Sequence, residues 1–265
     1  MSREEPTATI AVIKIGGSIF TGPISYHRAA KFIERRLGAA PEEGLVVVVS
    51  ARNGVTDSLL QEAQAILPEP GAAALDLLWS TGELHSVAIL ALHLQALGIA
   101  AAAFNVSQTG LILPERGFDA ASAQFDSADI RGALRSHRVV IVPGFLANDP
   151  SGVTVTLGRG GSDLTAVLLA AGLGACRCEL IKDVPGYFSD DPHQDAHARH
   201  LPALSFAQAV AMADAGCDLV QRQALEAAAR HRLPLVVRSL DESATESWIT
   251  SNPAIGEMPA AQTEM

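Results

Sequence analysis

The sequence predicts an α/β protein, a three-layer α/β/α sandwich built around one mostly parallel sheet. Short runs of β-branched residues alternate along the chain with longer segments of helical apolar spacing. Residues 44–51 ("GLVVVVSA") show no polar alternation, which is typical of a strand buried on both faces. The chain has 265 residues, 48% of them hydrophobic, so it is long enough to bury a sizeable core.

The individual elements follow in chain order. Residues 8–17 predict a strand that ends in glycines, and residues 25–39 predict a helix with charge between its apolar positions. The longest apolar run, 87–104, is broken by polar residues and a glycine, so it predicts a buried helix (82–98) and then a strand rather than a membrane span. The remaining elements are expected at 101–108, 137–149, 153–175 (strand, turn and helix), 177–186, 205–216, 221–232 and 233–240, where the last strand closes the sheet.

Charge and cysteine content narrow the classes of function. The net charge of −10 argues against nucleic acid as a partner, because phosphate backbones require Lys and Arg. Three cysteines, Cys176, Cys178 and Cys217, are too few for a disulfide framework and suit a reducing cytosol. The polar first residues do not form a signal peptide, so a cytoplasmic protein without membrane contact is expected.

The segment after Leu240 is polar and contains Pro253 and Pro259. Polar termini with prolines are commonly poorly ordered. Residues 251–265 are therefore expected to form a flexible tail on a single domain that covers 1–265.

Three glycine-rich turns follow predicted strands, at residues 14–18, 50–54 and 158–163. In an open α/β sheet, ligands bind beyond the carboxyl ends of the strands. Glycines let the backbone approach a ligand, the amides of a following helix favour anions, and a lysine beside such a turn can hold a phosphoryl group. Neither the P-loop pattern nor GxGxxG is present, and each turn taken alone can be a plain chain reversal.

The third turn, "GRGGSD", has further chemical content. Arg159 offers a planar fork suited to a carboxylate. Ser162 stands where a helix N-cap is expected, and Asp163 lies in the first helical turn, so capping alone is the alternative reading of this pair. Capping does not explain Arg159, which adds a cation to a helix end that is already positive. A bound anion would reconcile these features.

Several stretches together resemble the aspartate kinases. They are "KIGGS" at 14–18, "VVVVSARNGVTDSLL" at 46–60, "STGELHSVAILALHLQALGIAA" at 80–101 and "TVTLGRGGSDLTAVLLAAGLGACRCELIKDVPGYFSDDP" at 154–192. The resemblance covers about residues 10–250. It implies the amino-acid kinase fold, with an acceptor-binding part at 10–150 and a nucleotide-binding part at 151–250. It also implies transfer of the γ-phosphoryl group of Mg·ATP to the side-chain carboxylate of L-aspartate, giving 4-phospho-L-aspartate, and a homodimer.

The resemblance also assigns roles to residues. Glu83 would meet the ammonium group of the acceptor, Arg159 its α-carboxylate, and Asp163 would orient the catalytic lysines. The acceptor-binding positions are Ser50, Thr56, Glu83, Arg159, Gly160, Gly161 and Ser162. The nucleotide-binding positions are Lys14, Gly16, Gly17, Ser18, Lys182, Asp183, Phe188 and His193. Without the family match, Glu83 is an ordinary helix glutamate.

The nucleotide side departs from the family pattern. Asp218 replaces a lysine that contacts the nucleotide, Lys182-Asp183 replaces Thr-Asp, and Phe188 and His193 fill the aromatic and arginine positions of the loop. We hypothesise that Lys182 supplies the missing charge, so that Lys14 and Lys182 share Asp163 between them. The alternative is a surface lysine with its charge in water.

Two other functions stay open. Asn53 and Asp57 lie near the acceptor turn, so a kinase of another small carboxylate or phosphate metabolite is one alternative. The stretch "LIKDVPGYF" is also similar to the corresponding stretch of uridylate kinases and molybdenum storage proteins. The second alternative is therefore a non-catalytic nucleotide-binding protein with a storage or regulatory role. The "GRGGSD" turn with Glu83 favours an amino acid. Because the resemblance ends near Thr250, inhibition by lysine, threonine or methionine is not expected.

Two groups of residues raise the possibility of a metal site. His193, His197 and His200 share no clean helical face in a polar stretch, which favours a solvated loop. Cys176 and Cys178 alternate along a strand, and buried structural thiols are the favoured reading. No metal-ligating residue is predicted. The only metal ion expected is the Mg²⁺ that accompanies ATP.

Overall fold

The computed structural model describes residues 9–114, 122–158, 160–192, 194–195, 197–241 and 245–252. Its frame is an eight-stranded sheet of order β12-β14-β13-β9-β1-β2-β6-β3, in which only the β13–β14 pair is antiparallel among the described strands. These strands are β1 (Ile10–Ile15), β2 (Gly44–Val49), β3 (Ala101–Ala103), β6 (Val139–Pro143), β9 (Cys178–Ile181), β12 (Ala203–Ser205), β13 (Leu235–Arg238) and β14 (Ser247–Thr250).

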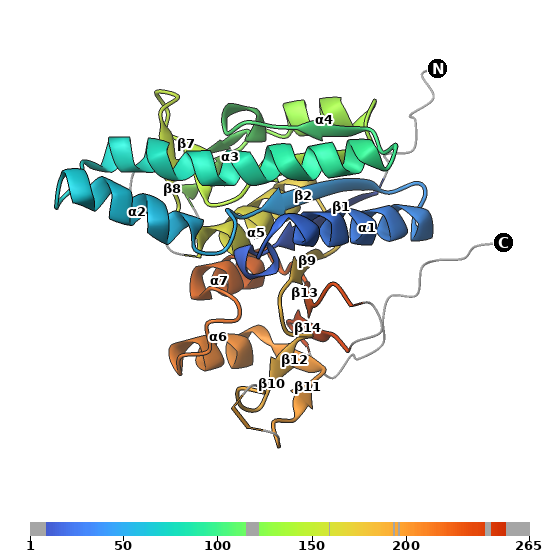
Figure 1. Cartoon of the computed structure of the whole chain (residues 1–265). Helices are drawn as coiled ribbons and strands as arrows, with labels where there is room; N and C mark the ends of the chain where they lie inside the picture. The colour runs from blue at the N-terminus through green and yellow to red at the C-terminus, as the bar shows by residue number, and fades with distance from the viewer. Residues whose placement is uncertain are drawn as a thin grey trace.

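Helices cover both faces of this sheet (Figure 1). On one face lie α1 (Pro23–Ala39) and α3 (Ala72–Ala96), with α2 (Val55–Ile66) packed on α3. The other face is covered by four helices, α4 (Ala128–Leu134), α5 (Gly161–Leu173), α6 (Phe206–Asp214) and α7 (Arg222–His231). The predicted three-layer α/β/α sandwich is therefore confirmed.

The strand sequences explain the two cores. Successive side chains of a strand point to opposite faces of the sheet. In β1, Ile13 and Ile15 pack toward α1 and α3, whereas Val12 packs toward α5 and α7. Lys14 follows the same alternation, so its side chain leaves β1 on the α5 side, where the helix begins.

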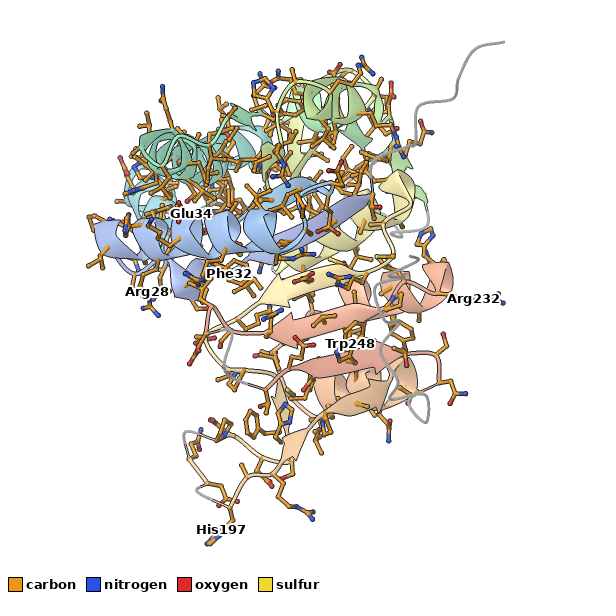
Figure 2. The ribbon with its side chains drawn as sticks, turned by 90° about the vertical axis from the view of Figure 1, so that its right-hand side faces the viewer. Arg28, Phe32, Glu34, His197, Arg232 and Trp248 are labelled. Carbon is orange, nitrogen blue, oxygen red and sulfur yellow. The ribbon has the colours of Figure 1, made fainter. Side chains whose placement is uncertain are left out.

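Two smaller sheets accompany the main one. The first has the order β5-β4-β7-β8, and the second pairs β10 with β11. Figure 1 shows β10 and β11 at the end of the molecule furthest from α3, and Figure 2 shows His197 pointing away from the protein there. The bounds are β4 (Leu111–Ile112), β5 (Gln124–Phe125), β7 (Leu146–Asn148), β8 (Thr154–Thr156), β10 (Tyr187–Phe188) and β11 (His200–Leu201), with single-turn helices at Gly17–Ile19 and Ser107–Thr109.

The C-terminal part of the fold differs from its prediction. Residues 233–240 do not close the sheet, because β14 pairs with β13 and lies between it and β12. The sequence predicted no element between Leu240 and residue 251, yet residues 247–250 form β14, in which Ser247 and Ile249 are buried. Only two alternate side chains of β14 are buried and the surrounding residues are polar, so the hydrophobic pattern was too weak to predict a strand. Of the predicted tail, 253–265 lie outside the described residues.

Helix α3 also differs, since it begins ten residues before the predicted start. It is long and apolar enough to cross a membrane by length and composition, which is weak evidence alone, and 39% of its most apolar window is buried in the fold. The prediction of a buried helix is correct for its inner side only. Cys178 is buried as predicted, whereas Cys176 is exposed and Cys217 is half-buried.

Candidate active site

Two lysines and one aspartate meet where β1, β9 and α5 come together. Lys14 Nζ lies 2.7 Å from Asp163 Oδ1, and Lys182 Nζ lies 2.8 Å from Asp163 Oδ2. Lys14 is in β1, Lys182 directly follows β9, and Asp163 is in the first turn of α5. The side chains of Lys14, Asp163 and Lys182 are all buried. The chain contains only three lysines, so two of its three lysines are buried at this one point. The structure thus brings together the trio that the sequence placed around one carboxylate.

The trio carries more positive than negative charge. Burial alone would raise the pKa of Asp163, but the two lysines outweigh it and hold that pKa well below its usual range. Burial lowers the pKa of Lys182; the Asp163 carboxylate opposes this shift, and the Lys14 charge adds to it. A second anion placed beside the trio would relieve the repulsion between the lysines, so the charge of this corner suits an anion such as a phosphoryl group.

A cavity of about 720 Å³ opens beside the trio. It brings together residues from both predicted halves of the site, acceptor and nucleotide. Among the predicted residues it is lined by Lys14, Gly17, Ser18, Ser50, Thr56, Glu83, Gly160, Gly161, Ser162, Asp163 and Lys182. This volume is within the range of small-molecule sites in enzymes.

The first glycine-rich turn, at residues 14–18, packs closely against the second, at residues 50–54. A Cβ atom on Gly17 would lie 2.7 Å from the carbonyl oxygen of Ala51, so only glycine is accommodated there. Gly16 N–H donates to the Ile181 carbonyl at 3.3 Å, and Ser18 Oγ donates to Asp183 Oδ1 at 3.3 Å. Gly16 and Asp183 therefore flank the cavity through these contacts, although neither lines it.

The third turn forms the start of α5. Gly160 is the N-cap, with φ of 76°, a left-handed conformation that favours glycine. The prediction of Ser162 as N-cap is therefore wrong, because the helix begins at Gly161 and Ser162 lies one residue further on. Ser162 is buried and lines the cavity. Arg159 lies outside the described residues.

Glu83 enters the cavity from α3. A Cβ atom on Gly82 would lie 3.0 Å from Val55 and 3.1 Å from Ala51, so Gly82 allows α3 to approach the turn after β2. Glu83 is 3% exposed, and its buried Oε2 atom has no hydrogen-bond partner among the residues that the structure describes. Burial raises the pKa of Glu83 to about 8, opposed by the Ala51 N–H and the Lys14 charge. A buried carboxylate oxygen that is left free beside a cavity, as Oε2 is among the described residues, is suited to a ligand cation.

No described residue of the predicted nucleotide loop after Lys182 lines the cavity. Phe188 lies in β10 and packs edge-on against His200, with ring centroids 5.3 Å apart, and it does not line the cavity. His193 lies outside the described residues. Asp218 does line the cavity, on the side of α7. No group of three or more His, Cys, Asp or Glu is placed to hold a metal ion in the part of the chain that is described.

Sequence reasoning missed an aromatic wall of the cavity. Trp79 and Phe145 line it with ring centroids 5.8 Å apart, and Trp79 Nε1 donates to the Thr56 carbonyl at 3.2 Å. Trp79 precedes Glu83 by one helical turn, so the spacing along α3 could have identified it. Phe145 has φ of 68°, which is unusual for a bulky residue and carries no sequence signal.

A model of the amino acid kinase family matches residues 9–239. The chain belongs to the amino acid kinase family. Within it, the chain is 39% identical to the aspartokinase of Thermus thermophilus over 232 residues, which are 87% of this chain and 56% of that protein. It is also 39% identical to the aspartokinase of Mycobacterium bovis over 234 residues, 87% of this chain and 54% of that one. The chain thus spans about half the length of the curated relatives it matches.

Solved structures of amino acid kinases share the architecture. The aspartate kinase of Synechocystis superposes with a TM-score of 0.79 at 32% identity, covering 93% of this chain and 40% of that chain. Aspartokinase III of E. coli, solved with aspartate and ADP, gives 0.76 at 25% identity, covering 92% and 65%. The uridylate kinase of Archaeoglobus fulgidus gives 0.65 at 18% identity, covering 91% of this chain and all of that chain, which shows the fold alone.

Proposed function

We propose that the protein transfers the γ-phosphoryl group of ATP to the side-chain carboxylate of an amino acid, with L-aspartate as the acceptor and 4-phospho-L-aspartate as the product. The observation that carries the proposal is one cavity that holds the Lys14–Asp163–Lys182 trio together with Glu83, whose buried Oε2 atom has no hydrogen-bond partner among the described residues. One end of the cavity suits phosphate, and the other suits an ammonium group. The similarity to aspartokinases supports the choice of acceptor.

The trio would stabilise the phosphoryl group during transfer. Phosphoryl transfer needs little covalent chemistry from the protein, so positioning and charge neutralisation dominate. Lys14 and Lys182 approach from adjacent strands, and Asp163 holds both ammonium groups in place. The amides of Gly161 and Ser162 at the start of α5 add the positive end of a helix. These groups are fixed before the substrates bind, which is the arrangement that electrostatic catalysis requires.

Glu83 would select an amino acid as the acceptor. In the free protein its raised pKa leaves it largely protonated near neutral pH. An arriving ammonium group would pair with the ionised carboxylate and satisfy the buried Oε2 atom. We place Arg159 on the α-carboxylate of the acceptor, and Ser50, Thr56 and Ser162 around its polar groups. The reacting carboxylate then points toward Lys14.

ATP implies Mg²⁺, which usually keeps several water ligands and is held mainly by substrate phosphates. The described residues fit this mode, because their carboxylates in the cavity are dispersed and Asp163 is engaged by two lysines. When bound, Mg²⁺ would neutralise phosphate oxygens. We place the reaction in the cytosol, where reduced cysteines are expected.

A coupled assay of ADP release against a panel of acceptors tests the proposal. We expect turnover with L-aspartate, weaker turnover with L-glutamate because one methylene changes specificity only modestly, and none with UMP. Lys14→Ala should abolish turnover, whereas the half-buried Lys31, paired with Glu34 at 2.9 Å outside the cavity, offers a matched control in Lys31→Ala. Preference for UMP would favour a nucleotide kinase. Tight nucleotide binding without turnover of any acceptor would favour the storage or regulatory protein.

A further inference from the structure

The aromatic wall of the cavity, formed by Trp79 and Phe145, connects two groups of predicted acceptor-binding residues. Trp79 Nε1 donates to the carbonyl of Thr56, which is in the first turn of α2. At the other end of the wall, a Cβ atom on Gly161 would lie 3.2 Å from the Phe145 ring, and Gly161 is the first residue of α5. Thr56 and Gly161 also line the cavity. The wall therefore borders the part of the cavity that the acceptor would occupy.

Hydrogen bonds hold the wall in one position. Phe145 N–H donates to Thr165 Oγ1 at 3.0 Å, and the Phe145 carbonyl accepts from the N–H of Leu157 at 2.8 Å. These contacts maintain the left-handed conformation of Phe145, which persists in a bulky residue only where the surroundings determine it. Trp79 meets this fixed ring edge-on, at 5.8 Å and an interplanar angle of 65°, which is a favourable aromatic geometry. The indole is therefore held by its N–H and by its ring, and it has little freedom to move aside.

The wall lies beside a span whose two ends are fixed. Trp79 precedes Glu83 by four residues on α3, so both side chains project from the same face of the helix, and both line the cavity. In the proposed function, Glu83 holds the ammonium group of the acceptor and the reacting carboxylate points toward Lys14. Glu83 and Lys14 are both buried, so the fold sets the distance between them. An acceptor with one more methylene group has to bend sideways to fit the same span.

We propose that Trp79 determines the chain length of the acceptor, so that the site accepts a four-carbon amino dicarboxylate and disfavours the five-carbon one. This inference rests on the proposed function, phosphoryl transfer to an amino acid. The indole packs against the side-chain methylene of L-aspartate. The additional methylene of L-glutamate bends toward the indole, which Thr56 and Phe145 keep in place. One extra methylene in a closely fitting pocket commonly reduces kcat/KM by about 10- to 200-fold.

The first test compares kcat/KM for L-aspartate and L-glutamate in the wild type and in two variants of Trp79. Trp79→Leu removes the ring, so the preference for L-aspartate should fall by about tenfold or more, mainly because kcat/KM for L-glutamate rises. Trp79→Phe keeps a smaller ring and should give an intermediate preference. The KM for ATP should not change in either variant. Trp248→Phe alters a tryptophan of β14 that does not line the cavity, so it is the matched control and should behave as the wild type.

The second test uses fluorescence and needs no turnover. The chain contains two tryptophans, so in Trp248→Phe the emission comes from Trp79 alone. L-aspartate added in the presence of ADP and Mg²⁺, where no transfer can occur, should change this emission. In Trp79→Phe the remaining emission comes from Trp248, and L-aspartate should leave it unchanged.

The outcomes separate this inference from the proposed function. If the wild type does not turn over L-aspartate, the proposed function fails and the inference fails with it. If the wild type does turn it over, an unchanged preference in folded Trp79→Leu would overturn the inference alone. An equal loss of activity toward both acceptors would also overturn it, because Trp79 would then be only structural. If Trp79→Leu does not fold in urea-unfolding measurements, an unchanged preference in Trp79→Phe or an unresponsive Trp79 emission would overturn it.

Discussion

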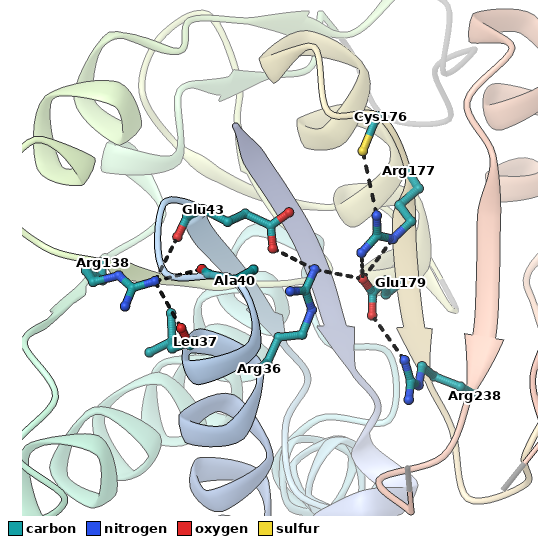
Figure 3. A network of polar contacts seen from close by, with 9 residues as sticks. All are labelled: Arg36, Leu37, Ala40, Glu43, Arg138, Cys176, Arg177, Glu179 and Arg238. Carbon is teal, nitrogen blue, oxygen red and sulfur yellow. Dashed lines mark hydrogen bonds and ion pairs between the residues drawn. The ribbon is translucent and has the colours of Figure 1, made fainter. Parts of the chain in front are cut away.

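Two buried ion clusters adjoin β9, one at each end of the strand and on opposite faces of the sheet. At the carboxyl end, Lys14 and Lys182 share Asp163 beside the cavity. At the amino end, Glu179 is surrounded by Arg36, Arg177 and Arg238 under α1 (Figure 3). Both clusters gather cations around one buried carboxylate. They differ in the type of cation, in their net charge and in whether they face the cavity.

The Glu179 cluster is balanced in charge, and none of its residues lines the cavity. Arg177 lies 2.8 Å from Glu179 Oε1, and Arg36 contacts both Glu179 at 3.5 Å and Glu43 at 2.6 Å. Arg238 contacts Glu179 Oε2 at 3.8 Å and Glu246 at 3.4 Å, so three arginines meet three glutamates. Arginine suits this role, because its planar fork can bind several oxygens at once.

The lysine cluster has an unmatched positive charge and faces a cavity. Lysine presents a compact charge on a flexible stem, which can follow a phosphoryl group as it moves. The balanced cluster therefore fixes α1 and the loop before β2 to β9, whereas the unbalanced cluster has positive charge left for an anion. Substitutions should therefore affect stability at one end of β9 and activity at the other.

The largest effect is expected for Glu179→Gln. Removing this buried carboxylate leaves three half-buried guanidinium groups without their shared partner, which should lower the free energy of unfolding by about 3–5 kcal/mol. Urea unfolding measures this loss, and kcat should stay within about twofold at a temperature where the variant is folded. Glu34→Gln, which removes the exposed partner of Lys31, is the control and should cost well under 1 kcal/mol. A loss of that small size for Glu179→Gln would contradict a structural role.

The next effect is expected for Lys182→Ala, at the other end of the strand. Losing one preorganised cation at the transferring group should reduce kcat by about 10²–10³. Stability should change little, because Asp163 keeps its 2.7 Å contact with Lys14. Steady-state kinetics beside urea unfolding separates the two quantities. A variant that keeps more than about half of wild-type kcat would show that Lys182 is only a buried structural cation.

Glu83 gives a smaller effect with a pH signature. Its pKa of about 8 in the folded protein is above its ordinary value of 4.5, so between these values the folded state holds the proton more tightly than the unfolded chain. Stability from this group is therefore present below pH 4.5 and is lost as pH rises toward 8. The loss should be on the order of 3 kcal/mol. Glu83→Gln should remove this decline, as unfolding at pH 5 and pH 8 can show.

The same titration should affect acceptor binding. The KM for L-aspartate should fall as pH rises through about 8, because an ionised Glu83 pairs with the ammonium group. In Glu83→Gln the KM should be raised and should lose this dependence, while the KM for ATP stays the same. A parallel pH profile in the wild type and the variant would assign the titration to another group.

The sequence predicted the site where local rules determine position. Lys14 lies near the end of β1 and Lys182 directly follows β9, and these are neighbouring parallel strands whose carboxyl ends share one edge of the sheet. The pairing of Lys182 with Asp163 could be inferred for that reason. The burial of Glu83 could not be inferred from the sequence. It depends on how closely Gly82 lets α3 approach Ala51, which is a contact between distant segments.

The missed fold elements share another cause. Strand β14 has only two buried side chains, Ser247 and Ile249, so its periodicity is short and one of its inward residues is polar. Its position between β12 and β13 is set by pairing rather than by local propensity. The Glu179 cluster is likewise invisible in sequence, since its arginines come from α1, the residue before β9 and the end of β13.

The smallest effect is expected for Asp218→Lys, which restores the charge of the family lysine at the cavity. Asp218 is exposed, so the charge acts through solvent, and a reversal near the triphosphate is worth about 1 kcal/mol. The KM for ATP should fall roughly fivefold, and less at high salt because exposed charges are screened. Asp57→Lys makes the same charge change on the acceptor side of the cavity and should leave the KM for ATP unchanged.

The double variant Lys182→Ala/Asp218→Lys then asks whether the two positions supply the same charge. If Lys182 replaces the family lysine, a cation at 218 should recover part of the kcat that Lys182→Ala loses, because both groups would reach the same phosphate. Recovery of about tenfold is expected, since an exposed lysine is less preorganised than one held by Asp163 at 2.8 Å. If kcat does not recover although both single variants are folded, Lys182 does not replace the family lysine. Its role would then be closer to the structural role of the arginines around Glu179.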